Sequence, residues 1–441
     1  MQEDKEFVLK LAHSNKVKFV RLWFTDILGF LKSYAITIDE FEDALEEGVR
    51  FDGATTMGFI RPSEREMIAM PDVSTFKILP WRPKEDSVAR IFCDIYTTEM
   101  KPFEGDSRYV LKKTLRKAAE KNFTFYTGPE IEFFFFRNSG STEILDRGGY
   151  FDLTPLDVAS DYRRQIVLTL EDMGIGVISS HHEAANSQHE IDLRHDNALT
   201  TADHIMTFKL IAKEIGHLNN IYTSFMPKPL ANQNGSGMHI HQSLFEGETN
   251  VFFDDKSPLS LSKTGRHYVA GILKHCKDFF AITNQWVNSY KRLQFGFESP
   301  VYISWGTGGH NDLIRIPQCR PDKPESFRIE LKNPDSACNP YLTFAAILAS
   351  GLKGIEEQYE LPEPADIERE ITNRRDMQKL GLDPVPTQLN EAIVHFEKSE
   401  LMRETFGDFV IEKFIENKML EIDKYNSYIT DYEISEYLPI L

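Results

Sequence analysis

Acidic and apolar side chains alternate in the segment GPEIEFFFF, which starts at residue 128. If this segment is a strand, Glu130 and Glu132 lie on the same face, because successive side chains point to opposite faces. Two neighbouring acids often belong to a solvated face, but Phe134 and Phe136 extend this one, which favours burial. Buried carboxylates would need cations, since an unpaired charge is costly away from water. The segment is therefore a candidate cation site.

Two further segments carry the same kinds of ligand. In SSHHEAANSQHEIDLR, Glu183 and Glu190 are separated by small residues, so a reversal of the chain could bring them together. In NGSGMHIHQSL, His239 and His241 share a strand face after a glycine loop whose N–H groups a ligand could approach. An H-x-H pattern alone is weak evidence for a metal site. Three histidines beside the glutamates could equally be structural hydrogen-bond partners and receive no metal role here: His181, His182 and His189.

The segment FRIELK places Glu330 on the polar face of a fourth predicted strand, together with Arg328 and Lys332. Taken alone, it is equally well explained as an ordinary amphipathic strand with paired charges. Together, the four segments offer five glutamates and at least one histidine, without a cysteine ligand. Such hard oxygen donors suit Mg²⁺ or Mn²⁺ better than a closed zinc site.

Divalent ions of this kind usually serve phosphate chemistry, where they neutralise a transferring phosphoryl group and align its oxygens. The chain has neither a P-loop nor a protein-kinase signature, so those folds are not the source of such chemistry. Three basic residues near the four segments could hold anionic oxygens: Arg292, Arg315 and Arg328.

The elements that must position these residues fall into two regions. Residues 17–100 alternate short strands and turns, which predicts a small mixed domain. Asp106 and Ser107 then cap a predicted helix, so we expect domains at 1–104 and 105–441, the second ending in a helical segment. The stretch 361–386 is rich in charge and proline and reads as a surface loop.

Composition restricts the partners. The 441 residues carry a net charge of −18, which argues against nucleic acid or an anionic membrane as the main partner. The four cysteines form no C-x-x-C pair, and no apolar run is long enough to span a membrane. We expect a cytoplasmic protein that acts on small molecules and cations and associates with copies of itself.

Seven segments resemble the motifs of a known family in order, from about residue 17 to the end of the chain. They are FDG at 51–53, GPEIEFF at 128–134, HHEAANSQHE at 181–190, NGSGMHIHQSL at 234–244, NSYKRL at 288–293, LIRIP at 313–317 and RIELKNPDSACNPYLTFAAI at 328–347. The family is type I glutamine synthetase. The resemblance implies an α+β fold, with an N-terminal β-grasp domain and a catalytic domain built on a curved antiparallel sheet with flanking helices. It also implies a dodecamer of two hexameric rings, with active sites between subunits.

The resemblance implies two or more Mg²⁺ or Mn²⁺ ions in each site. One ion would be held by Glu132, Glu183 and Glu190. The other would be held by Glu130, His239 and Glu330. The co-substrate ATP would be contacted by His241, Ser243 and Arg328, with Arg315 at its phosphates.

The implied reaction joins glutamate and ammonia through γ-glutamyl phosphate, with release of ADP and phosphate, which is glutamine biosynthesis. The amino-acid substrate would lie among Asn234, Gly235, His239, Arg292 and Lys332. Asp52 of the adjacent subunit would take a proton from ammonium. Glu298 would close over the intermediate and accept a second proton.

Some residues depart from the family pattern. Gly308 and His310 stand in place of two arginines, and Lys332 replaces a third. These changes leave open whether the amine is ammonia or an organic amine, and whether the acid is glutamate. The alternatives are a γ-glutamylamine ligase and a catalytically silent, ring-forming binding protein.

Overall fold

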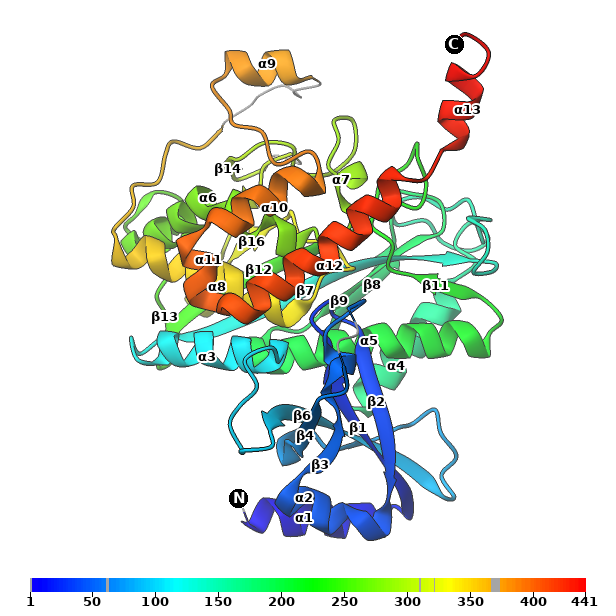
Figure 1. Cartoon of the computed structure of the whole chain (residues 1–441). Coiled ribbons are helices and arrows are strands. Elements are labelled where there is room, and N and C mark those ends of the chain that lie inside the picture. The colour runs from blue at the N-terminus through cyan, green and yellow to red at the C-terminus, as the bar shows by residue number, and fades with distance from the viewer. Residues whose placement is uncertain (1, 61–62, 309–310, 321, 366–372) are drawn as a thin grey trace.

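Two β-sheets organise the chain in the computed structural model, which describes residues 2–60, 63–308, 311–320, 322–365 and 373–441. Figure 1 shows the smaller sheet, with its two helices at the N-terminal end, below a larger sheet that helices cover. None of the helices in these ranges combines the length and apolarity that crossing a bilayer requires.

The smaller sheet has a parallel pair, β1 and β6, at its centre, and the other strands pair antiparallel. Helices α1 and α2 contribute Val8 and Phe41 to its separate apolar core. The expected small mixed domain is therefore present. Its strands and helices are β1 (Val17–Thr25), β2 (Leu31–Thr37), β3 (Val49–Asp52), β4 (Glu66–Pro71), β5 (Lys77–Ile78), β6 (Ser87–Thr97), α1 (Gln2–Ser14) and α2 (Phe41–Glu47).

The larger sheet positions the candidate site. Its main ladder is antiparallel, as expected, and among the described strands only the short edge pair β14 and β15 is parallel. In spatial order the strands are β14 (Trp305–Gly306), β15 (Ile314–Arg315), β16 (Ile329–Leu331), β12 (Met238–Glu246), β7 (Thr124–Phe136), β9 (Gln188–Leu193) and β8 (Val177–His182). The short strands β10 (Asp196–Asn197), β11 (Tyr222–Ser224) and β13 (Thr249–Asn250) extend it.

Strand β7 shows how the two faces of this sheet differ. Ile131, Phe133 and Phe135 are fully buried on the helix side, where the Phe133 ring lies 5.8 Å from that of Phe208 on α5. Glu130 and Glu132 point to the opposite face, because side chains alternate along a strand. The side chains on the helix side thus anchor the strand, and the opposite face can present its polar side chains to a ligand.

Helices pack closely against this core. A Cβ on Gly271 of α6 would lie 2.3 Å from the carbonyl oxygen of Ser350 on α8, so only glycine permits this approach. Figure 1 shows α3, α4 and α5 along the lower side and α10–α12 across the front. The helices are α3 (Ser107–Ala119), α4 (Ser160–Asp172), α5 (Ala198–Leu218), α6 (Lys263–Thr283), α7 (Ser289–Arg292), α8 (Pro340–Glu356), α9 (Arg374–Lys379), α10 (Leu389–Lys398), α11 (Glu400–Phe406), α12 (Asp408–Asn426) and α13 (Asp431–Tyr437).

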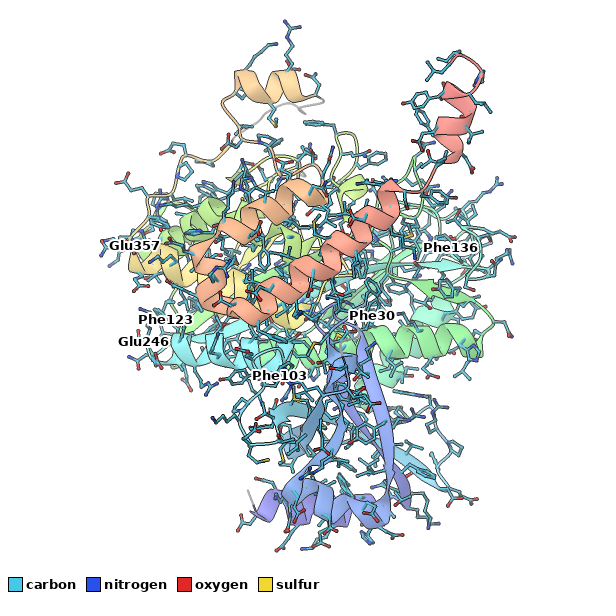
Figure 2. All side chains as sticks on the ribbon, viewed as in Figure 1. Phe30, Phe103, Phe123, Phe136, Glu246 and Glu357 are labelled. Carbon is cyan, nitrogen blue, oxygen red and sulfur yellow. The ribbon has the colours of Figure 1, made fainter. Side chains whose placement is uncertain are left out.

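Charged and aromatic contacts join the two sheets at α3. The helix begins after Asp106, whose carboxylate accepts the Arg108 N–H at 3.0 Å, as the capping pattern predicts. The Arg108 guanidinium forms ion pairs with Asp72 and Asp94 near the small sheet, and with Asp203 on α5. Phe103, labelled in Figure 2 near this junction, lies 5.3 Å from the ring of Phe409 on α12.

The stretch 361–386 was expected to be a loop, but its described part contains α9. Met377 of this helix is buried in a small apolar cluster with Val301 and Tyr302. Further along the chain, the expected helical segment ends in α13, which has no buried residue and stands clear of the body in Figure 1.

Candidate active site

Strand register gathers the acidic residues on one face of the larger sheet. Between β7 and β12, Glu130 lies opposite His239, and between β7 and β9, Glu132 lies opposite Glu190. Glu330 of β16 lies opposite His241 of β12. All six residues predicted as metal ligands therefore come from neighbouring strands or, for Glu183, from the turn after β8.

The first group consists of Glu130, His239 and Glu330, as predicted from the resemblance. Their potential ligand atoms all lie within 4.8 Å of one another. The His239 Nδ1 is 3.4 Å from a carboxylate oxygen of Glu130 and 3.4 Å from one of Glu330. Burial alone would lower the pKa of His239, but the surrounding glutamates outweigh it and raise that pKa.

The second group differs from the expected set. The atoms that lie within 4.8 Å of one another here belong to His181, Glu183 and Glu190. The His181 nitrogens are each 3.6 Å from one of these two carboxylates. Glu132 lies between the groups: one oxygen accepts the Gly237 N–H at 2.8 Å, and the other is 3.9 Å from His239. His181, which received no metal role from the sequence, thus faces the acidic cluster.

The glutamates of the second group are buried close to one another. Burial raises the pKa of Glu183 and of Glu190, and the nearby Glu132 carboxylate raises both further. A folded chain would not normally keep several buried acids together without a compensating charge. The donors are carboxylate oxygens with an imidazole in each group, so the residues fit Mg²⁺ or Mn²⁺.

The three residues expected to contact ATP line one cavity of about 360 Å³ next to this cluster: His241, Ser243 and Arg328. Tyr126, Ile178 and Phe327 contribute to its wall, and Glu130 also borders it. The cavity is therefore continuous with the first group of ligands.

His241 connects the cavity to the acidic cluster. Its Nδ1 accepts the Arg328 Nε–H at 3.2 Å, and its Nε2 is 2.6 Å from Glu130. Because a guanidinium can only donate, Nδ1 is the acceptor, and Nε2 carries the proton that His241 donates to Glu130. The two contacts fix the orientation of the ring at the point where the cavity meets the acids.

The residues expected at the amino-acid substrate lie beside the other end of the cluster. The Asn234 amide donates at 3.2 Å to the carboxylate of Glu298, the residue predicted to close over the intermediate. Arg292 is buried beneath the loop at Gly235 and donates to the carbonyl oxygens of Asn333 and Lys332 at 2.9 and 3.0 Å. In this structure its donors thus face the protein backbone.

The remaining predicted residues are placed as follows. The Arg315 Nε donates to Glu330 of the first group, and Lys332 is buried next to that strand, where burial lowers its pKa. A Cβ added at Gly308 would have no atom within 4 Å among the described residues. His310 lies outside the described residues.

Asp52 is not gathered with the others. It ends β3 of the smaller sheet, is exposed, and accepts the N–H groups of Ala54 and Arg65 at 3.0 and 3.2 Å. Figure 1 shows β3 well away from the face formed by β7 and β12. Within one subunit, Asp52 therefore does not take part in the cluster.

Two aromatic residues near the site were missed by sequence reasoning. Tyr150 and Phe151 have ring centroids 5.6 and 4.9 Å from that of His181. Burial raises the pKa of Tyr150, and the nearby carboxylates of Glu183 and Glu190 raise it further, so this side chain faces the acids. The signal was a pair of aromatics after two glycines, whose position depends on a loop and not on periodicity.

Comparison with known proteins identifies the family. Residues 16–98 match the family model described as the β-grasp domain of glutamine synthetase, and residues 104–437 match that of its catalytic domain. The chain belongs to the glutamine synthetase family. This family consists of carbon–nitrogen ligases, and its two-domain fold agrees with the two sheets described above.

Relatives within the glutamine synthetase family match over their whole length. The chain is 46% identical to the glutamine synthetase of Mycolicibacterium smegmatis, covering 100% of both proteins. It is 45% identical to that of Methanosarcina mazei, over 99% of this chain and 98% of the relative.

Solved structures give the same result. A structure of GmaS in complex with ADP has a TM-score of 0.88 at 30% identity and covers 98% of this chain and 99% of that one. Plasmodium falciparum glutamine synthetase has a TM-score of 0.88 at 26% identity, over 99% and 98% of the two chains.

Proposed function

We propose that this chain joins glutamate and ammonia to form glutamine, with ATP converted to ADP and phosphate. The observation that carries this proposal is the convergence of two carboxylate and imidazole groups beside the 360 Å³ cavity, in a glutamine synthetase fold. A carboxylate and a polyphosphate repel each other, so a site that joins them must supply positive charge and alignment.

The metal-binding role rests on the residues that converge. We propose that Glu130, His239 and Glu330 hold one ion and that Glu132, Glu183 and Glu190 hold another, with His181 close to the second group. When bound, Mg²⁺ or Mn²⁺ would neutralise phosphate charge and align the donor and acceptor oxygens.

The protein side chains would position the substrates. His241, Ser243 and Arg328 line the cavity in which the nucleotide would lie, and Arg315 stands beside Glu330, where it would meet the phosphates. The glutamate side chain would be phosphorylated to γ-glutamyl phosphate, which an amine then attacks. Asn234, Gly235, His239, Arg292 and Lys332 are the residues that we propose around the amino acid.

The amine step needs a neutral amine, and therefore a base. Glu298 is exposed and contacts Asn234, a position from which it could accept a proton from the bound amine. Because Asp52 lies away from the site of its own subunit, we propose that it serves the neighbouring subunit. In a closed ring of head-to-tail contacts every subunit can serve its neighbour in this way, and the proposed assembly is a dodecamer of two hexameric rings.

Two further assignments accompany this proposal. We divide the chain into domains at residues 1–104 and 105–441, which is supported by the position of α3 after residue 106. We also propose that the enzyme is cytoplasmic, which is supported by its four free thiols.

The decisive experiment measures phosphate release by the purified protein with ATP, Mg²⁺ and glutamate, and with ammonia, methylamine, ethanolamine or a polyamine as the amine. Release that depends on ammonia, with formation of glutamine, is the expected result. No release with any amine would refute the ligase proposal and leave a silent nucleotide-binding ring.

A γ-glutamylamine ligase is the second candidate. It is favoured by the absence of arginine at position 308 and by Lys332, since both changes lie in the part of the site that contacts substrates in the family. In the same experiment, a marked preference for an organic amine would select this candidate.

A further inference from the structure

Lys228 is a buried cation next to the proposed amino-acid site, with only 6% of its surface exposed. Its backbone is fixed by Asn288, which accepts the Lys228 N–H at 2.8 Å and donates to its carbonyl oxygen at 3.0 Å. Among the described residues, no carboxylate forms an ion pair with this ammonium. A charge in such a place must be stabilised by other means.

An aromatic ring provides this stabilisation. The Lys228 Nζ lies 3.3 Å from the centroid of the Phe297 ring and also donates to the carbonyl oxygen of Gln233. A cation over the face of an aromatic ring is attracted by the quadrupole of the ring, and the attraction grows when water is excluded. The contact therefore holds Phe297 against the segment that contains Lys228.

The next residue in the chain is Glu298, the proposed proton acceptor. Its loop, residues 294–299, is fixed at one end by Ser299, whose hydroxyl donates to the Arg292 carbonyl oxygen at 2.9 Å. Within the loop Gly296 has a φ of 84°, which favours glycine, so the loop turns sharply just before Phe297. Phe297 over Lys228 and Glu298 on Asn234 are consecutive contacts with the same segment, residues 228–234.

We propose that Lys228 is a positioning residue, whose ammonium holds Phe297 so that Glu298 faces the proposed amine site. This inference rests on the proposed function, because it gives Glu298 its place in that reaction. Lys228 does not line the nucleotide cavity, so its removal is expected to affect the amine step and not the binding of ATP.

A double-mutant cycle tests the coupling between the two side chains. Lys228→Met keeps the apolar stem without the charge, and Phe297→Leu keeps an apolar side chain without the ring. Each single variant is expected to lower kcat about threefold to tenfold, with an unchanged KM for ATP. The kcat of the double variant should be no lower than that of the less active single variant. Phe297→Tyr and Lys228→Arg should retain most of the rate. Additive losses would overturn the proposal.

Hydrogen exchange of the peptide that covers residues 293–299 provides a readout that does not depend on activity. Exchange there should be faster in both single variants and unchanged in Phe297→Tyr. Lys274→Met is the matched control, because Lys274 lies 3.6 Å over the ring of Tyr359, outside the site. Unchanged exchange in the Lys228 and Phe297 variants would refute the proposal that this contact holds the loop in place. A wild-type protein that makes no glutamine would instead refute the proposed function, and the exchange result would still stand.

Discussion

Glu130 on β7 lies directly opposite His239 on β12, with its carboxylate 3.4 Å from the Nδ1 of the imidazole. These residues are more than a hundred positions apart in the sequence, and only the register of two central strands joins them. A shift of that register by one residue would turn one of the two side chains to the opposite face. The apolar face of β7, packed against α5, therefore determines where the two side chains of the acidic face meet.

Removal of one carboxylate from the cluster should weaken cation binding. Glu183→Gln keeps the size of the side chain and removes the charge, so we expect affinity for Mn²⁺ to fall at least about tenfold and glutamine formation to be nearly lost. Titration calorimetry with Mn²⁺ measures the first effect. Glu246→Gln is the control, because Glu246 is exposed at the outer end of β12, at the edge of the molecule in Figure 2. Equal Mn²⁺ affinity in both variants would contradict the metal assignment.

The contact between Arg328 and His241 should matter for the nucleotide. Arg328→Lys removes the planar donor that fixes the His241 ring, and a lysine ammonium cannot reproduce its geometry. We expect the KM for ATP to rise about tenfold, as for the loss of a hydrogen bond to a charged group, with little change in the KM for glutamate. Steady-state kinetics with each substrate varied in turn gives the answer. A parallel rise in both constants would argue against a nucleotide role.

The proposed sharing of the site between subunits predicts complementation. Asp52→Asn and Glu183→Gln should each be inactive alone, because each removes a different half of every site. When the two proteins are dissociated, mixed in equal amounts and reassembled, random head-to-tail pairing gives about a quarter of the sites both intact halves. Recovered glutamine formation near that fraction is the expected result. Without any recovery, Asp52 would have to act within its own subunit or not at all.

Gly308 offers a test of the missing arginine. Gly308 is exposed, and a Cβ at this position would have no described atom within 4 Å, so we expect Gly308→Arg to fold. If a fixed cation stabilises the phosphoryl group, the variant should raise kcat several-fold. Gly140→Arg, in the exposed loop after β7, is the control for added charge and should leave kcat unchanged. An unaltered kcat in Gly308→Arg would show that position 308 does not reach the phosphates.

The ion pairs at Asp72 predict a pH dependence of stability. Burial alone would raise the pKa of Asp72, but Arg108, the Ser74 hydroxyl and Lys112 together outweigh it and lower that pKa from 3.8 to about 2. A carboxyl pKa lowered by folding stabilises the protein above the unfolded value, and this contribution, about 2 kcal/mol, is lost as the pH falls through the folded value. Asp72→Asn should therefore lower the thermal midpoint near neutral pH, and the difference from wild type should shrink between about pH 4 and pH 2. A difference that is constant over this range would contradict the assignment.

Local periodicity explains which parts of the site could be predicted. The shared face of Glu130 and Glu132, and that of His239 and His241, follow from alternation within one strand, which needs no knowledge of partners. The grouping of ligands from different strands was predicted instead from the resemblance to glutamine synthetases. The metal-binding role of these side chains stays a prediction.

The features that were missed depend on contacts between distant segments. His181 lies opposite Glu190 in the β8–β9 hairpin, a relationship that no single segment reveals. Tyr150 reaches the acids from a loop, whose path is not periodic. The charge and proline around α9 made its segment resemble a loop. Among its described side chains only Met377 is buried, which gives too little apolar pattern to indicate a helix.

The ion pairs of Arg108 have a consequence for the assembled protein. Because one guanidinium fastens carboxylates of the small sheet to α5, that sheet cannot swing freely on its own subunit. Each subunit would thus present Asp52 to its neighbour in a fixed orientation, which is already set before the proposed ring assembles. A single subunit that dilution has separated from the rings would lack the Asp52 of its neighbour. We therefore expect dilution to abolish turnover abruptly, while the single subunit still binds nucleotide.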